Sequence, residues 1–67
     1  MDKHERKLII GDEVYRPHYK FDGGEYFISE NPIHGAESWV ALMDDGHLEL
    51  LFNGVHRPYN TEYTLEG

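Results

Sequence analysis

The chain has 67 residues, enough for one small domain, and it contains no cysteine. Disulfide bridges and thiolate metal sites are therefore excluded, and the composition is compatible with a reducing, cytoplasmic environment. The net charge is −7, which disfavours nucleic-acid binding because phosphate contacts need clustered lysine and arginine.

The N-terminal part begins with a charged segment without periodicity, residues 1–6, which we expect to be a flexible terminus. A single folded domain is then expected over residues 7–67. It opens with the short apolar run 8–10, followed by a strand over 13–16 that is rich in β-forming residues. Pro17 lacks an N–H donor, so we expect this strand to end there at an edge or a bend.

Residues 18–21 alternate between polar and aromatic side chains, which favours a strand. Residues 22–24 are Asp-Gly-Gly, a turn pattern, and they lead into a predicted strand over 25–30. Residues 31–37 then form a predicted loop that contains proline and glycine.

The clearest hairpin follows this loop. Residues 38–43 form a predicted strand that is apolar on both faces, so we expect it to be central in its sheet. A turn over 44–46, Asp-Asp-Gly, leads to a second strand over 47–52. The Asp-Gly pair fits either a type I′ turn or a three-residue loop with Gly46 in the left-handed conformation.

The dipeptide Asn53-Gly54 is the strongest short-range hairpin pattern of the chain. It predicts a returning strand over 55–57, which Pro58 places at an edge or a bulge, and residues 61–65 form a predicted last strand. No helical periodicity is present. We therefore expect an all-β fold, a small barrel of about five or six short antiparallel strands with little or no helix.

Two segments resemble known families. The sequence Ile10-Gly11-Asp12-Glu13-Val14-Tyr15 is similar to the Gly-Asp-x-Val opening of SH3-like barrels, including KOW-type domains. The segment 15–20 resembles a Tyr-Arg-His-Tyr-Lys segment of small bacterial domains of unknown function, although Pro17 interrupts it. The first resemblance implies an SH3-like barrel and, by analogy with that group, a role in binding peptides, proteins or nucleic acids.

The negative charge is concentrated in residues 21–55, which contain no lysine or arginine. Their acidic residues are Asp22, Glu25, Glu30, Glu37, Asp44, Asp45 and Glu49. We expect a non-enzymatic protein-interaction module that binds a protein or a basic peptide. The alternative is a small phage- or prophage-type inhibitor whose acidic face mimics a nucleic acid. A solvated acidic face that only keeps the domain soluble is the simplest explanation of the charge.

No catalytic, cofactor or metal site is expected. The histidines lack the spacing of a preformed metal pair, so a site would have to be assembled in space, for example from His34, His47 and Glu49. The serines and threonines lie in no nucleophile motif, and about 60 residues leave little room for a catalytic cleft. We also expect no membrane segment, and either a monomer or a homodimer that pairs through residues 61–65.

Aromatic side chains beside acidic loops are the best candidates for contact with a partner, because SH3-like barrels use such groups to bind peptides. The candidate partner-binding residues are Tyr26, Glu30, His34, Glu37, Trp39, Asp44 and Asp45. The alternative for Trp39 is a place in the core, since its strand is apolar on both faces.

Overall fold

The computed structural model describes residues 6–32 and 35–67, and within them seven strands form one antiparallel sheet. The strands are β1 (Lys7–Ile10), β2 (Glu13–Phe21), β3 (Gly24–Ser29), β4 (Trp39–Met43), β5 (Leu48–Phe52), β6 (Val55–Tyr59) and β7 (Thr64–Glu66). The all-β class is confirmed, with seven strands in place of the five or six expected. Among the described residues there is no helix with the length and apolar character needed to cross a membrane.

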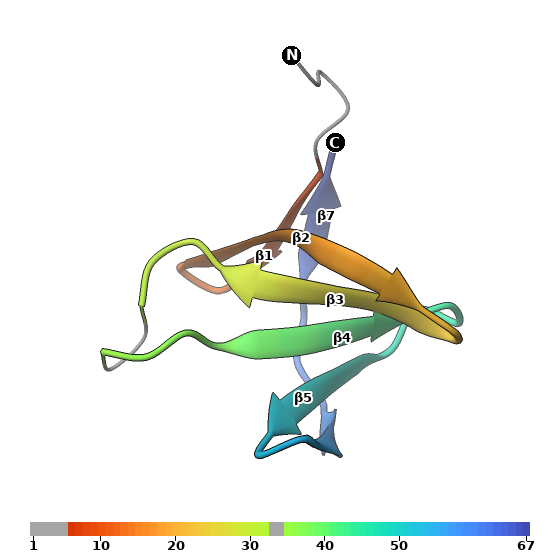
Figure 1. Ribbon diagram of the computed structural model, residues 1–67. Coiled ribbons are helices and arrows are strands. Elements are labelled where there is room, and N and C mark those ends of the chain that lie inside the picture. Colours follow the sequence, from red (N-terminus) through yellow and green to blue (C-terminus); the bar gives the residue numbers. More distant parts are fainter. Residues whose placement is uncertain (1–5, 33–34) are drawn as a thin grey trace.

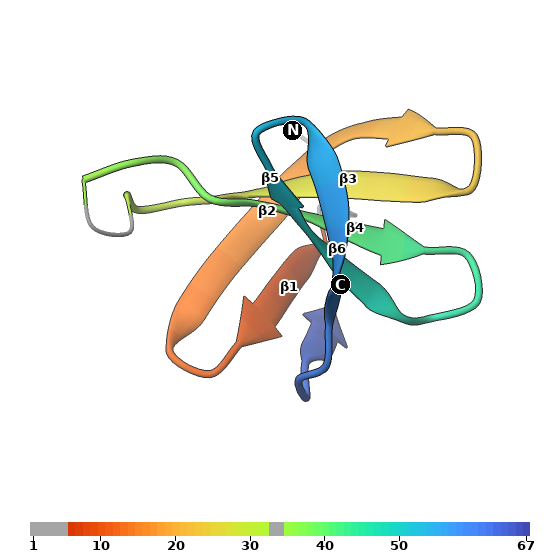
Figure 2. The same ribbon diagram turned by 90° about the horizontal axis from the view of Figure 1, so that it is seen from below.

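The sheet is strongly curled. Its strand order is β6-β5-β4-β3-β2-β1-β7, so each strand pairs with its sequence neighbour except β7, which returns to the far edge beside β1. Figures 1 and 2 show β2, β3 and β4 side by side, with the β1–β7 edge and the β5–β6 edge bent toward the same side. Within the described part of the chain β6 and β7 do not pair with each other, so the sheet forms an incompletely closed barrel.

The core fills the concave face of this sheet. It is built from buried side chains of the first five strands: Leu8, Ile10, Tyr15, Phe27, Val40 and Leu48. Phe27, Leu8 and Val40 are its largest fully buried side chains. Tyr59 and Tyr63 pack against the core from the C-terminal part, and the Tyr63 hydroxyl donates to the carbonyl oxygen of Gly46 at 2.6 Å. This contact ties the connection between β6 and β7 to the β4–β5 turn.

Strand β2 does not end at Pro17, contrary to the sequence prediction. The strand continues to Phe21, and the pairing with β3 shifts by one residue between Pro17 and Tyr19. This β-bulge makes His18 an extra residue opposite a continuous partner strand. A bulge is one of the few sites where a strand inside a sheet accepts proline, because the regular pairing is already interrupted there.

The two predicted hairpins are confirmed, and their turn types differ. Gly46 has a φ of 97°, its N–H donates to the carbonyl oxygen of Met43, and Asp45 keeps a negative φ. The turn after β4 is therefore the three-residue loop with a left-handed glycine. At the next turn both Asn53 (φ 52°) and Gly54 (φ 77°) are left-handed, as a type I′ turn requires.

Pro58 lies in β6, which is an edge strand of the sheet. The predicted edge position of this proline is therefore confirmed, although the strand continues two residues beyond its predicted end at Arg57, to Tyr59. The last strand is shorter than predicted, since only residues 64–66 pair with β1. Arg6, assigned to the terminus by sequence, contacts the carboxylate of Glu25 at 2.6 Å.

The ring of Phe27 is the largest fully buried side chain among the described residues. Replacement of Phe27 by alanine should lower the free energy of unfolding by about 3–5 kcal/mol, because it removes buried apolar surface and leaves a cavity. Phe52 is a matched control, since 58% of its surface is exposed. Phe52→Ala should change stability by only about 0.5 kcal/mol. Urea denaturation measures both, and equal losses would contradict this assignment of the core.

Candidate functional site

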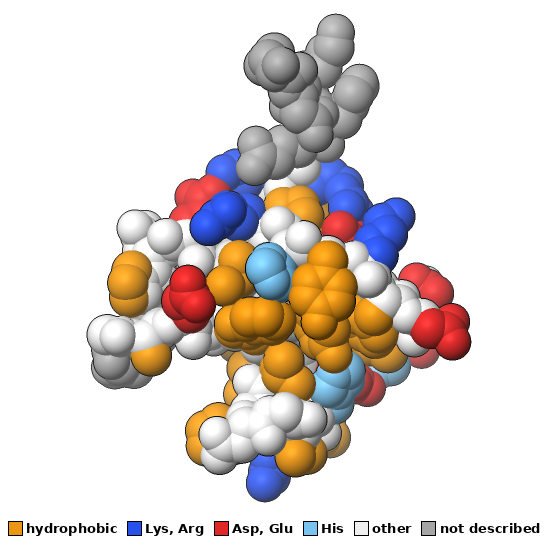
Figure 3. Space-filling view, viewed as in Figure 1, with side chains coloured by type: hydrophobic (Ala, Val, Ile, Leu, Met, Phe, Trp, Pro, Cys, Tyr) orange, Lys and Arg blue, Asp and Glu red, His pale blue; other side chains and the backbone are white. Residues whose placement is uncertain are grey.

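The outer, convex face of the sheet carries a layer of aromatic rings over β2, β3 and β4, and the ring of His56 extends this layer from β6. We call this layer the aromatic patch; it consists of His18, Tyr19, Phe21, Tyr26, Trp39 and His56. Figure 3, seen from the same side as Figure 1, shows hydrophobic and histidine side chains gathered over these strands. Because side chains alternate between the faces of a strand, Tyr26 lies outside while its neighbour Phe27 lies in the core.

The bulge in β2 is responsible for much of this patch. Tyr15 points into the core, and with regular alternation Tyr19 and Phe21 would point there as well. The extra residue His18 reverses the alternation, so that Tyr19 pairs with Tyr26 on the outer face. The bulge therefore moves two aromatic side chains of β2 from the core to the outer surface.

Four rings of the patch form a closed circuit of edge-to-face contacts. His18 contacts Tyr19 at 5.0 Å and Trp39 at 4.7 Å between ring centroids, and Tyr26 contacts Tyr19 at 5.2 Å and Trp39 at 5.9 Å. The interplanar angles lie between 61° and 75°. This geometry is favourable for aromatic pairs, and it fixes each ring against two neighbours. The circuit is therefore a preorganised aromatic surface.

The patch covers part of the sheet and remains open to solvent itself. Beneath it, Ala41 is fully buried and Ile28 is 5% exposed. Tyr19 is 51% exposed, and His18 also belongs to the exposed residues. The rings thus provide a second apolar layer on the outer face, whose upper side is available for contact with another molecule.

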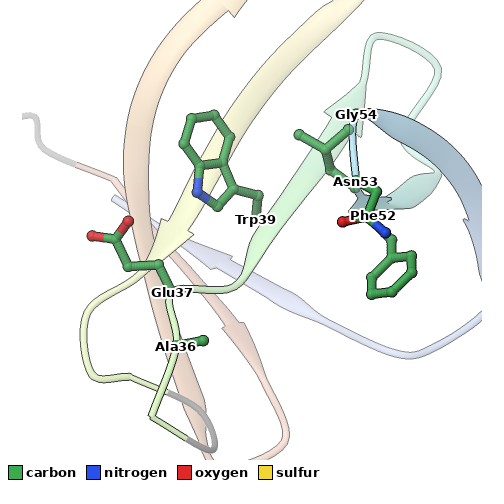
Figure 4. A pocket seen from close by; sticks show the side chains of 7 residues that line it. Ala36, Glu37, Trp39, Phe52, Asn53 and Gly54 are labelled. Atoms are coloured by element: carbon green, nitrogen blue, oxygen red, sulfur yellow. The ribbon is translucent and has the colours of Figure 1, made fainter.

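A groove continues from Trp39 toward the β5–β6 hairpin. It has a volume of about 450 Å³ and is lined by Ala36, Glu37, Trp39, Leu51, Phe52, Asn53 and Gly54. Figure 4 shows the Glu37 and Trp39 side chains on one side of it and the tip of the β5–β6 hairpin on the other. Trp39 belongs to both the groove and the patch, which makes them one continuous surface.

A chain of hydrogen bonds runs along one edge of the patch. The ring of His56 bonds Glu49 Oε1 through Nδ1 at 2.7 Å and the Tyr26 hydroxyl through Nε2 at 2.8 Å. The second oxygen of Glu49 bonds His47 Nε2 at 2.9 Å, and His47 Nδ1 bonds Asp45 at 2.5 Å. Tyr26 on β3 and His56 on β6 meet above the two strands between them, β4 and β5. The partner of Tyr26 in register on β4 is Ala41, whose methyl group leaves room for the phenol ring.

The ionisable groups joined by these hydrogen bonds stabilise the charged forms of one another. The carboxylates of Glu49 and Asp45 raise the pKa of His47 above its usual value. In return, hydrogen bonds from His47 and His56 lower the pKa of Glu49, and bonds from the backbone and ring of His47 lower that of Asp45. Glu49 is therefore ionised at neutral pH and holds both imidazole rings in place.

Three of the residues predicted to bind a partner lie together on this surface. Tyr26 and Trp39 are in ring contact within the patch, and Glu37 stands beside Trp39 in the groove. Trp39 is half-buried on the outer face, so its sequence alternative, a place in the core, is not what the structure shows. Sequence reasoning missed the two histidine rings, His18 and His56, because their contacts depend on the bulge and on the pairing of distant strands.

The other predicted residues lie elsewhere. Asp44 and Asp45 occupy the turn after β4, at the opposite end of this strand from Trp39. Glu30 follows β3 and forms an ion pair with Lys7. His34 lies outside the described residues. Partner binding by these residues stays a prediction.

The acidic residues of segment 21–55 are distributed over several parts of the sheet. Glu25 pairs with Arg6, Glu49 lies on the outer face, and Asp22 and Asp44 are in neighbouring turns joined by the hydrogen bond from Asp44 N to Gly23 O at 2.9 Å. They therefore do not form an array on one face, which is the arrangement that mimicry of a nucleic acid needs.

The metal site considered from the sequence involved His34, which lies outside the described residues. Its other two members, His47 and Glu49, are hydrogen-bonded to each other. Within residues 6–32 and 35–67, no group of three or more His, Asp or Glu side chains is arranged to hold a metal ion.

Comparisons of this chain with protein-family models, curated proteins and solved structures find no match. We therefore derive a function from the chemistry of the aromatic patch and of the groove.

The link between His47 and its carboxylates predicts a defined pH dependence. Because the pKa of His47 is raised above 6.5, its stabilising contribution is complete below pH 6.5 and is lost as the pH rises through the raised pKa. The pKa of Glu49 is lowered from 4.5, so its contribution is present above pH 4.5 and is lost as the pH falls through the lowered pKa. The stabilising contributions of His47 and Glu49 are therefore both present between pH 4.5 and pH 6.5.

An NMR titration of the His47 ring should therefore give a pKa above 6.5 in the wild-type protein. Glu49→Gln should move this pKa downward, since it removes the first of the two carboxylate partners. Glu62→Gln, an exposed substitution outside the chain of hydrogen bonds, should leave it unchanged. The same His47 pKa in all three proteins would show that the bond to Glu49 does not form in solution.

Proposed function

We propose that this domain is a non-enzymatic protein-interaction module whose aromatic patch and adjoining groove form the binding surface. The observation that carries this proposal is the exposure of preorganised aromatic rings on the outer face, continuous with the groove at Trp39. Exposed aromatic residues are enriched where proteins bind one another, because they bury much area while losing little conformational freedom.

The charges around the groove favour a partner that carries positive charge. The groove contains one carboxylate, that of Glu37, and no lysine or arginine. The whole segment 21–55 lacks lysine and arginine, whereas five of the six lysines and arginines of the chain precede residue 21. A cationic segment of a protein would meet favourable charge here, and a nucleic acid would be repelled.

The alternative function, inhibition through mimicry of a nucleic acid, stays a prediction with less support. Its requirement is a row of carboxylates on one face at the spacing of phosphates. Glu25 and Glu30 are instead paired with basic side chains, and Glu49 is hydrogen-bonded to His47 and His56.

We place the domain in the cytoplasm, because the absence of cysteine suits a reducing compartment. Both a monomer and a homodimer are compatible with the binding surface. The exposed residue Leu65 lies on β7 at one edge of the sheet, and β6 with Pro58 forms the other. Proline blocks pairing at part of the second edge, so β7 is the edge at which two copies would pair.

The proposal is tested with a patch variant that should remain folded. Tyr19 is 51% exposed, and Trp39 lies outside the core cluster, so Tyr19→Ser combined with Trp39→Leu should leave the core intact. The immobilised wild-type domain should retain a specific protein from a lysate of its source organism. The double variant should lose most of this binding, because the rings supply the contact area.

Leu65→Ser provides the control, since it removes an exposed apolar side chain that lies on β7, away from the patch. It should retain the same protein as the wild type. Circular dichroism establishes that all three domains are folded. A folded wild-type domain that retains nothing, or a double variant that binds as well as the wild type, would refute the proposal.

A further inference from the structure

We propose that the groove binds an arginine side chain of the partner, with its guanidinium group stacked on the Trp39 ring and paired with the carboxylate of Glu37. This inference rests on the proposed function and specifies the chemistry that the binding surface recognises.

Glu37 and Trp39 lie close together at the start of β4. Trp39 is the first residue of this strand, and Glu37 precedes it by two residues. Both line the groove, and Figure 4 shows them on the same side of it. An aromatic plane beside a carboxylate matches the two binding modes of a guanidinium, which stacks on rings and forms paired hydrogen bonds with carboxylates.

None of the ion pairs among the described residues involves Glu37. The other carboxylates near basic groups are already engaged: Glu25 with Arg6, Glu30 with Lys7, and Glu49 with His47 and His56. Glu37 is exposed, and the residues that line the groove with it include no basic side chain. On the outer face Arg16 lies opposite Ile28, two strands from Trp39. The usual strand spacing puts the Cα atoms of Arg16 and Trp39 about 10 Å apart.

The ring of Trp39 is held in place by its neighbours. It contacts the rings of His18 at 4.7 Å and Tyr26 at 5.9 Å between centroids, and the Tyr26 hydroxyl is in turn bonded to the ring of His56 at 2.8 Å. Trp39 is therefore fixed before a guanidinium group stacks on it.

Arginine is favoured over lysine by the shape of this site. Its guanidinium is planar, presents five donors and is weakly hydrated, so it can stack on Trp39 while it bonds Glu37. The ammonium group of lysine is compact and strongly hydrated, and it would gain the charge interaction without the stacking.

The test uses a capped pentapeptide, acetyl-Gly-Gly-Arg-Gly-Gly-amide, titrated into the ¹⁵N-labelled full chain. Trp39 is the only tryptophan, so its indole N–H gives one resolved signal. The arginine peptide should shift this signal in a saturable way. The lysine peptide should bind several-fold more weakly, and the citrulline peptide, which keeps the shape and lacks the charge, should produce no saturable shift.

Glu37→Gln should weaken binding of the arginine peptide by about five- to tenfold, because the charge is lost while the shape is kept. Glu62→Gln, an exposed acidic residue outside the groove, should bind like the wild type. Equal binding of the arginine and citrulline peptides, or unchanged binding by Glu37→Gln, would overturn the inference. The two proposals can fail separately. If the arginine peptide does not bind, while Tyr19→Ser combined with Trp39→Leu still loses the protein partner, the inference is wrong and the proposed function stands.

Discussion

Strand β4 carries apolar side chains on both faces, and a single sheet must shield both of them from water. Val40 is fully buried on the concave face, and Ala41 is fully buried on the convex face. The concave side is covered by curling, since the strands at both edges bend over the core formed around Phe27. No second sheet or helix covers the convex side in the described residues. The aromatic rings take that place, as a layer one side chain thick.

This constraint explains why the binding surface and the fold involve the same side chains. A ring that covers Ala41 or Ile28 has its inner side against the sheet and its outer side in water. The cover is fixed by edge-to-face contacts among four rings and by the hydrogen bonds from Glu49 through His56 to Tyr26. Such a layer is rigid before a partner arrives, so less conformational entropy is lost on binding.

The bulge at His18 links the two sides of the sheet. Before the bulge, Tyr15 belongs to the concave core, and after it Tyr19 belongs to the convex patch. One strand thus contributes to both apolar layers. A regular strand would have left Tyr19 and Phe21 on the concave side and Tyr26 without two of its ring contacts. The proline at position 17 stands directly before the shift, where its missing N–H donor is tolerated.

The sequence by itself determined the all-β class, the places of the two hairpins and the two-faced character of residues 38–43, because these features depend on local turn chemistry and on alternation along one strand. It also indicated Tyr26, Glu37 and Trp39 as candidates, from residue type and charge. The tertiary structure decided that β2 passes through Pro17, that β7 pairs with β1, and that His18 and His56 join the patch. These features depend on register between strands distant in sequence, and a shift of one residue exchanges the two faces. Local patterns do not specify that register, since it is set by packing across the whole sheet.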